Sequence, residues 1–276
     1  FGKIPSNVRF STTFGSLYSA VRLDGRMDFH GGIPIAVQPY YLVHRWNYVR
    51  SLSTFFQDVR PSFLVSNESE WGLEFLIPTG DRSVLKFFQS HLSTNDFTYP
   101  EWEFTPADTT DFSGFEGWVM GGDWHSSSLD DKQFARLGSR MQFSLRRFTG
   151  KVNAVYEDPL ADPIRTNLHK EDVGFFRLSG DFEQYMTTKS EALSVGFRGE
   201  FRLSDESLRS TYRASLVQAT PFEPMPGAKS VFLEGFRSYN YVAAGIIADL
   251  RILKSVRWRS ECHAMHSYGE INDSPK

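Results

Sequence analysis

The chain has 276 residues, a formal net charge of −3 and one cysteine, Cys262. Nucleic-acid binding needs a basic excess to neutralise phosphates, so this balance argues against nucleic acid as a partner. A single cysteine excludes a disulfide framework and a cysteine-ligated metal site. No stretch approaches the ~20 apolar residues of a membrane-crossing helix, which excludes a helical membrane protein.

Aromatic residues make up 15% of the chain, while mean hydropathy is only −0.36. Both numbers fit a membrane β-barrel, in which every second residue faces a polar interior and aromatic girdles mark the membrane interfaces.

Period-two alternation of apolar and polar residues dominates the chain from residue 17 onward. Segment 17–29 places Leu17, Val21, Leu23, Met27 and Phe29 on one face. Its other face carries Tyr18, Arg22, Asp24, Arg26 and Asp28. The pattern returns in 35–46, 140–146, 176–183, 193–203, 244–252 and 256–265. A wall with lipid outside and a charged lumen inside has this pattern, which predicts an all-β antiparallel transmembrane β-barrel.

The connections alternate between short and long. Short links carry Gly, Asp or small polar residues at 30–33, 79–82, 126–138, 187–190 and 253–255. Long links span 47–62, 93–112, 150–172 and 204–238. This asymmetry is typical of tight periplasmic turns and longer outer loops, and it predicts about eleven strands, most of ~9–14 residues. Because bacterial barrels have even strand numbers, we expect this chain to be part of a larger barrel. A soluble β-sandwich or lipocalin-like barrel stays open, since alternation does not say which face is outside.

Several motifs occur in a recognisable order. They include Trp46-Asn-Tyr48, Gly72-Leu-Glu-Phe-Leu-Ile-Pro78, Ala219-Thr-Pro-Phe-Glu-Pro224, Ser230-Val-Phe-Leu-Glu-Gly-Phe-Arg-Ser-Tyr239 and Tyr241-Val-Ala-Ala-Gly245. Together they resemble the C-terminal outer-membrane barrel of the bacterial patatin-like phospholipase family, which is related to the BamA/TamA-type surface-antigen barrels. The resemblance implies that 1–276 is a single barrel domain of a sixteen-stranded barrel, incomplete at both ends, with the patatin and periplasmic domains not present.

Patatin-type hydrolysis needs a serine in a G-x-S-x-G turn, and no G-x-S-x-G occurs in this chain. We therefore expect no catalytic residue here, and any hydrolase activity to lie in another part of the protein. The seven histidines show no metal-ligand spacing, so no metal and no cofactor are predicted.

The loop motif Gly235, Phe236, Arg237 and Tyr239 looks like the V-R-G-F/Y tip of the BamA-type superfamily, although the glycine after the arginine is missing. The resemblance implies that Arg237 folds into the barrel and pairs with an acidic group on the inner wall. We expect Glu261 as its partner, with Asp249 and Asp181 as second choices, because a guanidinium fork suits a carboxylate.

The predicted lumen-facing charges have mixed sign, and cross-strand neutralisation explains them better than an ion-selective ring. They are Arg22, Asp24, Arg26, Asp28, Arg198, Glu200 and Arg202.

These observations predict a protein of the bacterial outer membrane. The main hypothesis is a membrane anchor, and a candidate translocator, for a patatin-like lipid hydrolase domain upstream. The alternatives are a BamA/TamA-like assembly or insertion factor and a passive pore. Expected partners are outer-membrane lipid, the upstream patatin domain, and other outer-membrane proteins or a second copy of the chain.

Overall fold

The structure of the chain is a computed structural model. It describes residues 5–48, 64–99, 110–131, 134–156, 167–189, 192–208, 212–223, 232–253, 256–269 and 271. Parts of all four predicted long links therefore lie outside the described residues, as do parts of the short links 126–138, 187–190 and 253–255.

In the described part of the chain, eleven strands form one antiparallel sheet, in the order β1-β2-β3-β4-β5-β6-β7-β8-β9-β12-β13. The strands are β1 (Ser6–Thr13), β2 (Tyr18–Phe29), β3 (Ile35–Tyr48), β4 (Leu64–Gly80), β5 (Ser83–Thr98), β6 (Asp111–Ser127), β7 (Gly138–Tyr156), β8 (Asn167–Thr187), β9 (Leu193–Ser204), β12 (Tyr241–Arg251) and β13 (Arg257–Ser267). Each pairs with the next along the chain, and β9 pairs with β12 across the connection 205–240. The predicted all-β antiparallel fold and the count of eleven strands are confirmed.

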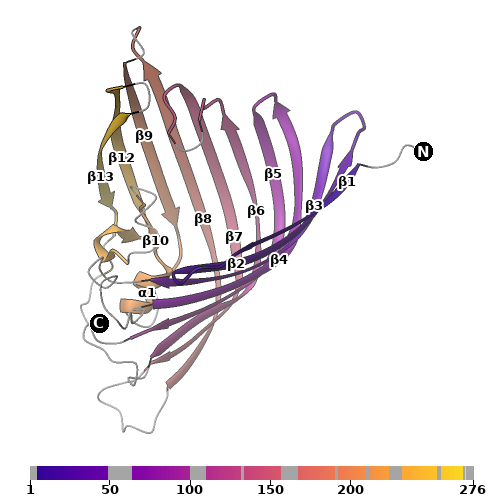
Figure 1. Ribbon diagram of the computed structural model, residues 1–276. Coiled ribbons are helices and arrows are strands. Elements are labelled where there is room, and N and C mark those ends of the chain that lie inside the picture. Colours follow the sequence, from indigo (N-terminus) through magenta and orange to yellow (C-terminus); the bar gives the residue numbers. More distant parts are fainter. Residues whose placement is uncertain are drawn as a thin grey trace.

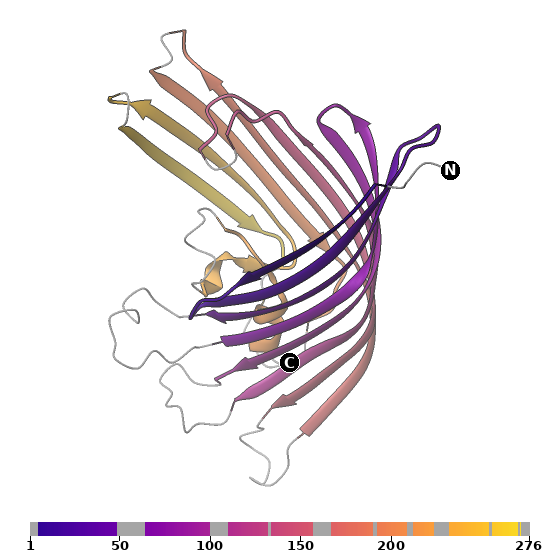
Figure 2. The same cartoon turned by 45° about the vertical axis from the view of Figure 1, so that its right-hand side comes forward.

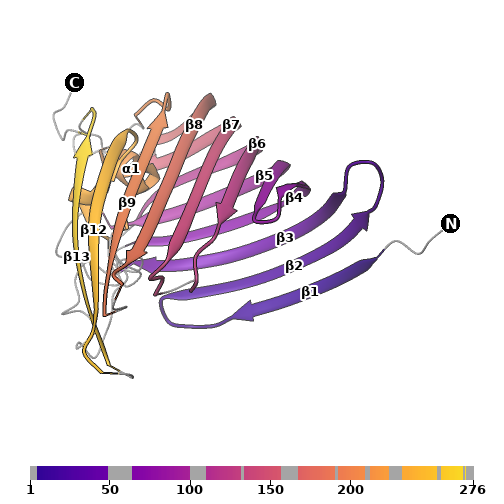
Figure 3. The same cartoon turned by 90° about the horizontal axis from the view of Figure 1, so that it is seen from above.

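The sheet is strongly curved into an open trough (Figures 1 and 3). The short helix α1 (Tyr212–Gln218) and the small strand β10 (Thr220–Pro221) lie on the concave side of this trough (Figure 2). We call the concave side the inner face and the opposite side the outer face. No helix in the described part of the chain is long and apolar enough to cross a membrane.

The two faces differ in chemistry, as alternation along each strand requires. On β12, Val242 and Ile246 are exposed on the outer face, while Tyr241 and Ile247 are buried on the inner face. Large apolar side chains are exposed along the outer face of the other strands as well, among them Leu23, Trp71, Phe87, Met120, Leu145, Phe176 and Phe197. So wide an exposed apolar surface is untypical of a protein surrounded by water.

Strands β4 to β8 are longer than expected. They contain 17, 16, 17, 19 and 21 residues, whereas most strands were predicted to have ~9–14. The prediction ended β5 near Ser93 and β7 at Gly150, but the strands run on to Thr98 and Tyr156. Polar residues can continue an antiparallel ladder beyond the apolar part of a strand, because the backbone supplies the hydrogen bonds.

The inner face holds an apolar cluster on β5 to β8. Its buried members are Phe88, Phe115, Val119, Phe148, Val152 and Phe175. Phe148 and Phe175 stack with ring centroids 4.6 Å apart. Arg146 and Arg177 cover the cluster, with Cζ atoms 5.1 Å from the ring centroids of Phe88 and Phe148 respectively. Cation–π contacts of this kind let charged side chains close over an apolar patch.

Candidate functional site

The inner face of β2 carries two ion pairs within one strand. Arg22 Nε lies 2.6 Å from Asp24 Oδ1, and Arg26 Nη2 lies 2.8 Å from Asp28 Oδ1. Residues two apart on a strand point to the same side, so these partners meet without a neighbouring strand. The prediction that opposite charges pair between neighbouring strands is wrong for these four residues, which pair within β2.

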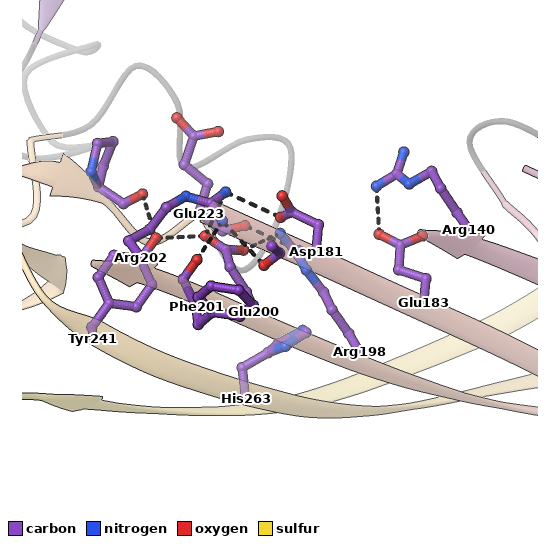
Figure 4. A network of polar contacts seen from close by, with 12 residues as sticks. Arg140, Asp181, Glu183, Arg198, Glu200, Phe201, Arg202, Glu223, Tyr241 and His263 are labelled. Carbon is purple, nitrogen blue, oxygen red and sulfur yellow. Dashed lines mark hydrogen bonds and ion pairs between the residues drawn. The ribbon is translucent and has the colours of Figure 1, made fainter. Parts of the chain in front are cut away.

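A larger network joins β8, β9 and β12 (Figure 4). Arg202 Nη2 lies 3.1 Å from Asp181 Oδ1 and 3.2 Å from Glu200 Oε1. Arg198 Nη2 lies 3.0 Å from Glu200 Oε2, and the Tyr241 hydroxyl donates to Glu200 Oε1. Glu200 is buried, and three donors satisfy it, as a buried carboxylate requires. Asp181, a second choice for Arg237, is thus the partner of Arg202.

A segment from the connection 205–240 is inserted against this inner face, and we call its described part the inserted segment. It contains α1, β10, the 3-10 turn η3 (Glu234–Phe236) and β11 (Arg237–Ser238), which pairs with β10. Arg198 Nη1 donates to Glu223 O at 3.1 Å, and the Tyr241 hydroxyl oxygen, whose proton is directed at Glu200, lies 3.2 Å from Pro221 O. Gln218 Nε2 donates to Asp96 Oδ2 on β5 at 2.6 Å. The segment therefore bridges walls of the trough that lie several strands apart.

Arg237 lies at the centre of the inserted segment with 9% of its surface exposed. Its Nη1 donates to Val217 O at 3.0 Å and to Ala219 O at 3.3 Å. Its Cζ lies 4.2 Å from the ring centroid of Phe232 and 5.5 Å from that of Tyr48 on β3. Burial lowers the pKa of the guanidinium. Arg237 thus ties α1, β11 and the wall together through carbonyls and rings.

The other residues of the loop motif have different environments. Gly235 is exposed, and a Cβ built there would meet no atom within 4 Å. Phe236 is 37% exposed and stacks on Phe222 at 6.1 Å. Tyr239 is buried two residues before the start of β12. Of the four motif residues, Arg237 and Tyr239 are therefore buried, and Gly235 and Phe236 are exposed.

The structure gives Glu261 and Asp249 partners other than Arg237. Glu261 Oε1 lies 2.5 Å from Arg259 Nε, and its Oε2 lies 3.0 Å from His263 Nε2, all three on the inner face of β13. Asp249 Oδ1 lies 3.3 Å from Arg136 Nε, and both side chains are buried. The expected pairing of Arg237 with Glu261 or Asp249 is therefore wrong. Arg259 on β13 pairs with Glu261, and Arg136 in the β6–β7 connection pairs with Asp249.

The described residues of the β6–β7 connection, 128–131 and 134–137, also lie on the inner face, but at the end of the sheet opposite α1 (Figure 2). Ser194 Oγ donates to Arg136 O at 2.7 Å, and Ala135 packs with Tyr185 and Ile247. Asp130 Oδ1 accepts the backbone N–H groups of residues 136 and 137 at 2.9 and 3.0 Å. Partial desolvation favours the protonated acid, but these donors outweigh it and lower the pKa of Asp130.

A cavity of about 300 Å³ remains between α1 and the wall. Its floor is the apolar cluster of β5 to β8, and its rim carries charges of both signs. The charged and polar lining residues are Tyr48, Ser66, Glu68, Glu70, Thr94, Asp96, Arg146, Arg177, Gln218 and Arg237. Several already have partners: Glu68 pairs with His44, and Arg177 pairs with Glu206.

Within the described ranges, no three His, Cys, Asp or Glu side chains are grouped as metal ligands would be.

Sequence reasoning missed Arg136 and the inserted helix. Seven residues are too few for a clear helical period, and no local signal links Arg136 to a strand more than 100 residues later. One signal was available: an arginine followed two positions later by an acid occurs at Arg22, Arg26, Arg198 and Arg259, and each forms that pair.

Comparisons with known proteins fit this geometry. No family model and no curated protein matches the sequence. Among solved structures, the chain is similar to BamA from Haemophilus ducreyi lacking POTRA domains 1–3, with a TM-score of 0.60 and 9% identity. The match covers 94% of this chain and 51% of that one, so this chain spans about half the length of that protein. At this identity, the similarity shows that the sheet has the fold of a BamA-like β-barrel.

Proposed function

We propose that this chain is the wall of a bacterial outer-membrane β-barrel. The observation that carries the proposal is the contrast between the two faces of one sheet: exposed apolar side chains outside, and paired charges inside. An apolar outer surface costs nothing against lipid tails, whereas paired charges suit an enclosed polar interior. The similarity to the BamA fold supports this location.

We further propose that the barrel serves as an anchor, and not as an open pore. The inserted segment covers the inner face at one end, and the described residues of the β6–β7 connection cover it at the other. Both are fixed by buried polar contacts, which oppose a wide water-filled channel.

The domain that the barrel anchors is proposed to be a patatin-like lipid hydrolase upstream, on the resemblance of the motifs given above. This chain would then provide attachment and no catalytic group.

The experiment uses the full-length protein. Heat-modifiable gel mobility reports barrel formation, and planar-bilayer recording reports conductance. We expect a folded barrel with little steady conductance, and lipid-ester hydrolysis that disappears when an upstream G-x-S-x-G serine is changed to alanine. A large steady conductance would support the passive pore instead.

The second candidate is an assembly or insertion factor. The fold similarity to BamA favours it, and depletion of the protein would then lower the levels of other outer-membrane proteins. If those levels stay normal while lipid hydrolysis is lost, the anchor is supported.

A further inference from the structure

Arg147 lies on the outer face of β7, among apolar side chains. It pairs in register with Met120 on β6 and with Phe176 on β8. Residues directly opposite each other in a sheet share a face, and these two neighbours are 48% and 45% exposed. If the outer face meets lipid, as in the proposed function, this arginine points toward lipid.

The position along the strand is the boundary of the apolar band. Trp71, His91 and Trp118 are successive cross-strand neighbours on the outer face of β4, β5 and β6, and Trp118 pairs in register with Thr149, two residues beyond Arg147 on β7. Their rings pack together, with the two indole centroids 5.5 Å apart. Toward the short connections, the outer face of β4 continues with Leu73, Phe75 and Ile77. Toward the long connections it continues with Ser69 and Asn67. Aromatic rings between apolar and polar zones mark the level of lipid headgroups.

The guanidinium of Arg147 has no carboxylate partner among the described residues. Its Cζ lies 4.4 Å from the ring centroid of Phe176, so the side chain runs along β8 toward Gly174. A Cβ at Gly174 would lie 3.1 Å from Arg147 Nη2, so glycine leaves room for the charged group. Asp205 lies beside Phe176, but its Oδ1 accepts the Phe176 backbone N–H.

Lys151 offers a contrast on the same strand. It is four residues farther toward the long connections, between Glu116 and Asp172 in register. An acid on each side can balance that lysine, whereas Arg147 has Met120 and Phe176 in the corresponding places. A cation at headgroup level with apolar neighbours needs an anion from the surroundings.

We propose that Arg147, with Trp118 and Phe176 beside it, binds the phosphate of a membrane lipid in the leaflet on the side of the long connections. The guanidinium holds phosphate oxygens by charge-assisted hydrogen bonds, and the exposed rings pack against the acyl chains. The inference rests on the proposed membrane location.

The test compares full-length wild type with Arg147→Gln, Arg147→Lys and the control Lys151→Gln, each released from detergent for native mass spectrometry. The probes are phosphatidylglycerol, diacylglycerol and inorganic phosphate. We expect Arg147→Gln to retain about tenfold less phosphatidylglycerol than wild type. Arg147→Lys keeps the charge and serves as the test if the glutamine variant folds poorly. Arg147→Lys and the control Lys151→Gln should each retain phosphatidylglycerol within about threefold of wild type. Diacylglycerol should bind weakly to all forms, and inorganic phosphate should not displace the phospholipid.

The proposed site is overturned if Arg147→Gln retains as much phosphatidylglycerol as wild type. It is also overturned if Lys151→Gln loses as much phosphatidylglycerol as Arg147→Gln does. If inorganic phosphate displaces phosphatidylglycerol, the proposal that the ligand is a lipid is overturned. Barrel insertion is scored separately by heat-modifiable mobility and resistance to urea extraction. Failure of the wild type in those assays overturns the proposed function, whereas normal insertion with unchanged lipid retention overturns only this inference.

Discussion

Replacing Arg237 with alanine tests whether the inserted segment depends on one buried side chain. The change removes the donor to Val217 O and Ala219 O and the cation over the Phe232 ring. A buried carbonyl left without its donor costs about 1–3 kcal/mol, and a desolvated cation–π contact contributes about 1–2 kcal/mol. Because truncation effects overlap, we expect the variant to lose about 3–5 kcal/mol of unfolding free energy.

The assay is urea unfolding of the full-length barrel in lipid vesicles, followed by heat-modifiable gel mobility. Arg26→Ala is the matched control. It removes an inner-face arginine whose side chain is 44% exposed and, among the described residues, paired only with Asp28, so it should cost less than about 1 kcal/mol. If the Arg237 and Arg26 variants unfold at the same urea concentration, the reasoning on buried donors is refuted.

Three further predictions concern the wall and its turn. Asp249→Asn removes the carboxylate charge that lies 3.3 Å from Arg136 Nε in a buried ion pair, and should cost about 3–5 kcal/mol of unfolding free energy in the same assay. An unchanged urea midpoint would contradict this. The lowered pKa of Asp130 means that its ionised form stabilises the turn. This stabilisation is complete above the ordinary aspartate pKa of about 4 and is lost as pH falls through the lower folded value. Limited proteolysis between pH 7 and pH 3 should therefore show the turn opening at the acid end, and Asp130→Asn should show that sensitivity already at pH 7. Gly117→Ala puts a Cβ against Thr149 O and 2.6 Å from Gly150 Cα on β7, and should cost about 1–3 kcal/mol of unfolding free energy. Gly199→Ala, with open space around it, should be neutral, and equal effects of the two changes would contradict the close approach.

Alternation along the strands predicted the wall because it reports which residues share a face. Leu23, Phe197 and Ile246 are exposed on the outer face, and the expected eleven strands form one sheet. The strand ends were misplaced at Ser93 and Gly150, because polar residues continue a ladder as readily as they form a loop.

The inner contacts were harder to predict, because they depend on register and on loop paths. Four arginine–acid pairs lie two residues apart and are visible in the sequence. Asp249 and Arg136 are separated by more than 100 residues, and only the fold brings them together. Arg237 contacts carbonyls and rings that no charge pattern could indicate.

The path of the inserted segment has a consequence for the order of assembly. It leaves the sheet after β9 and rejoins it at β12, yet Gln218 contacts Asp96 on β5, 122 residues earlier. Its docking surface exists only once β5 to β9 have paired and curved, so the segment must dock late. Contacts between residues so distant in the chain form slowly, because the entropy of closing a long loop comes first. A nascent chain would therefore present an unfilled trough before β12 and β13 pair with β9.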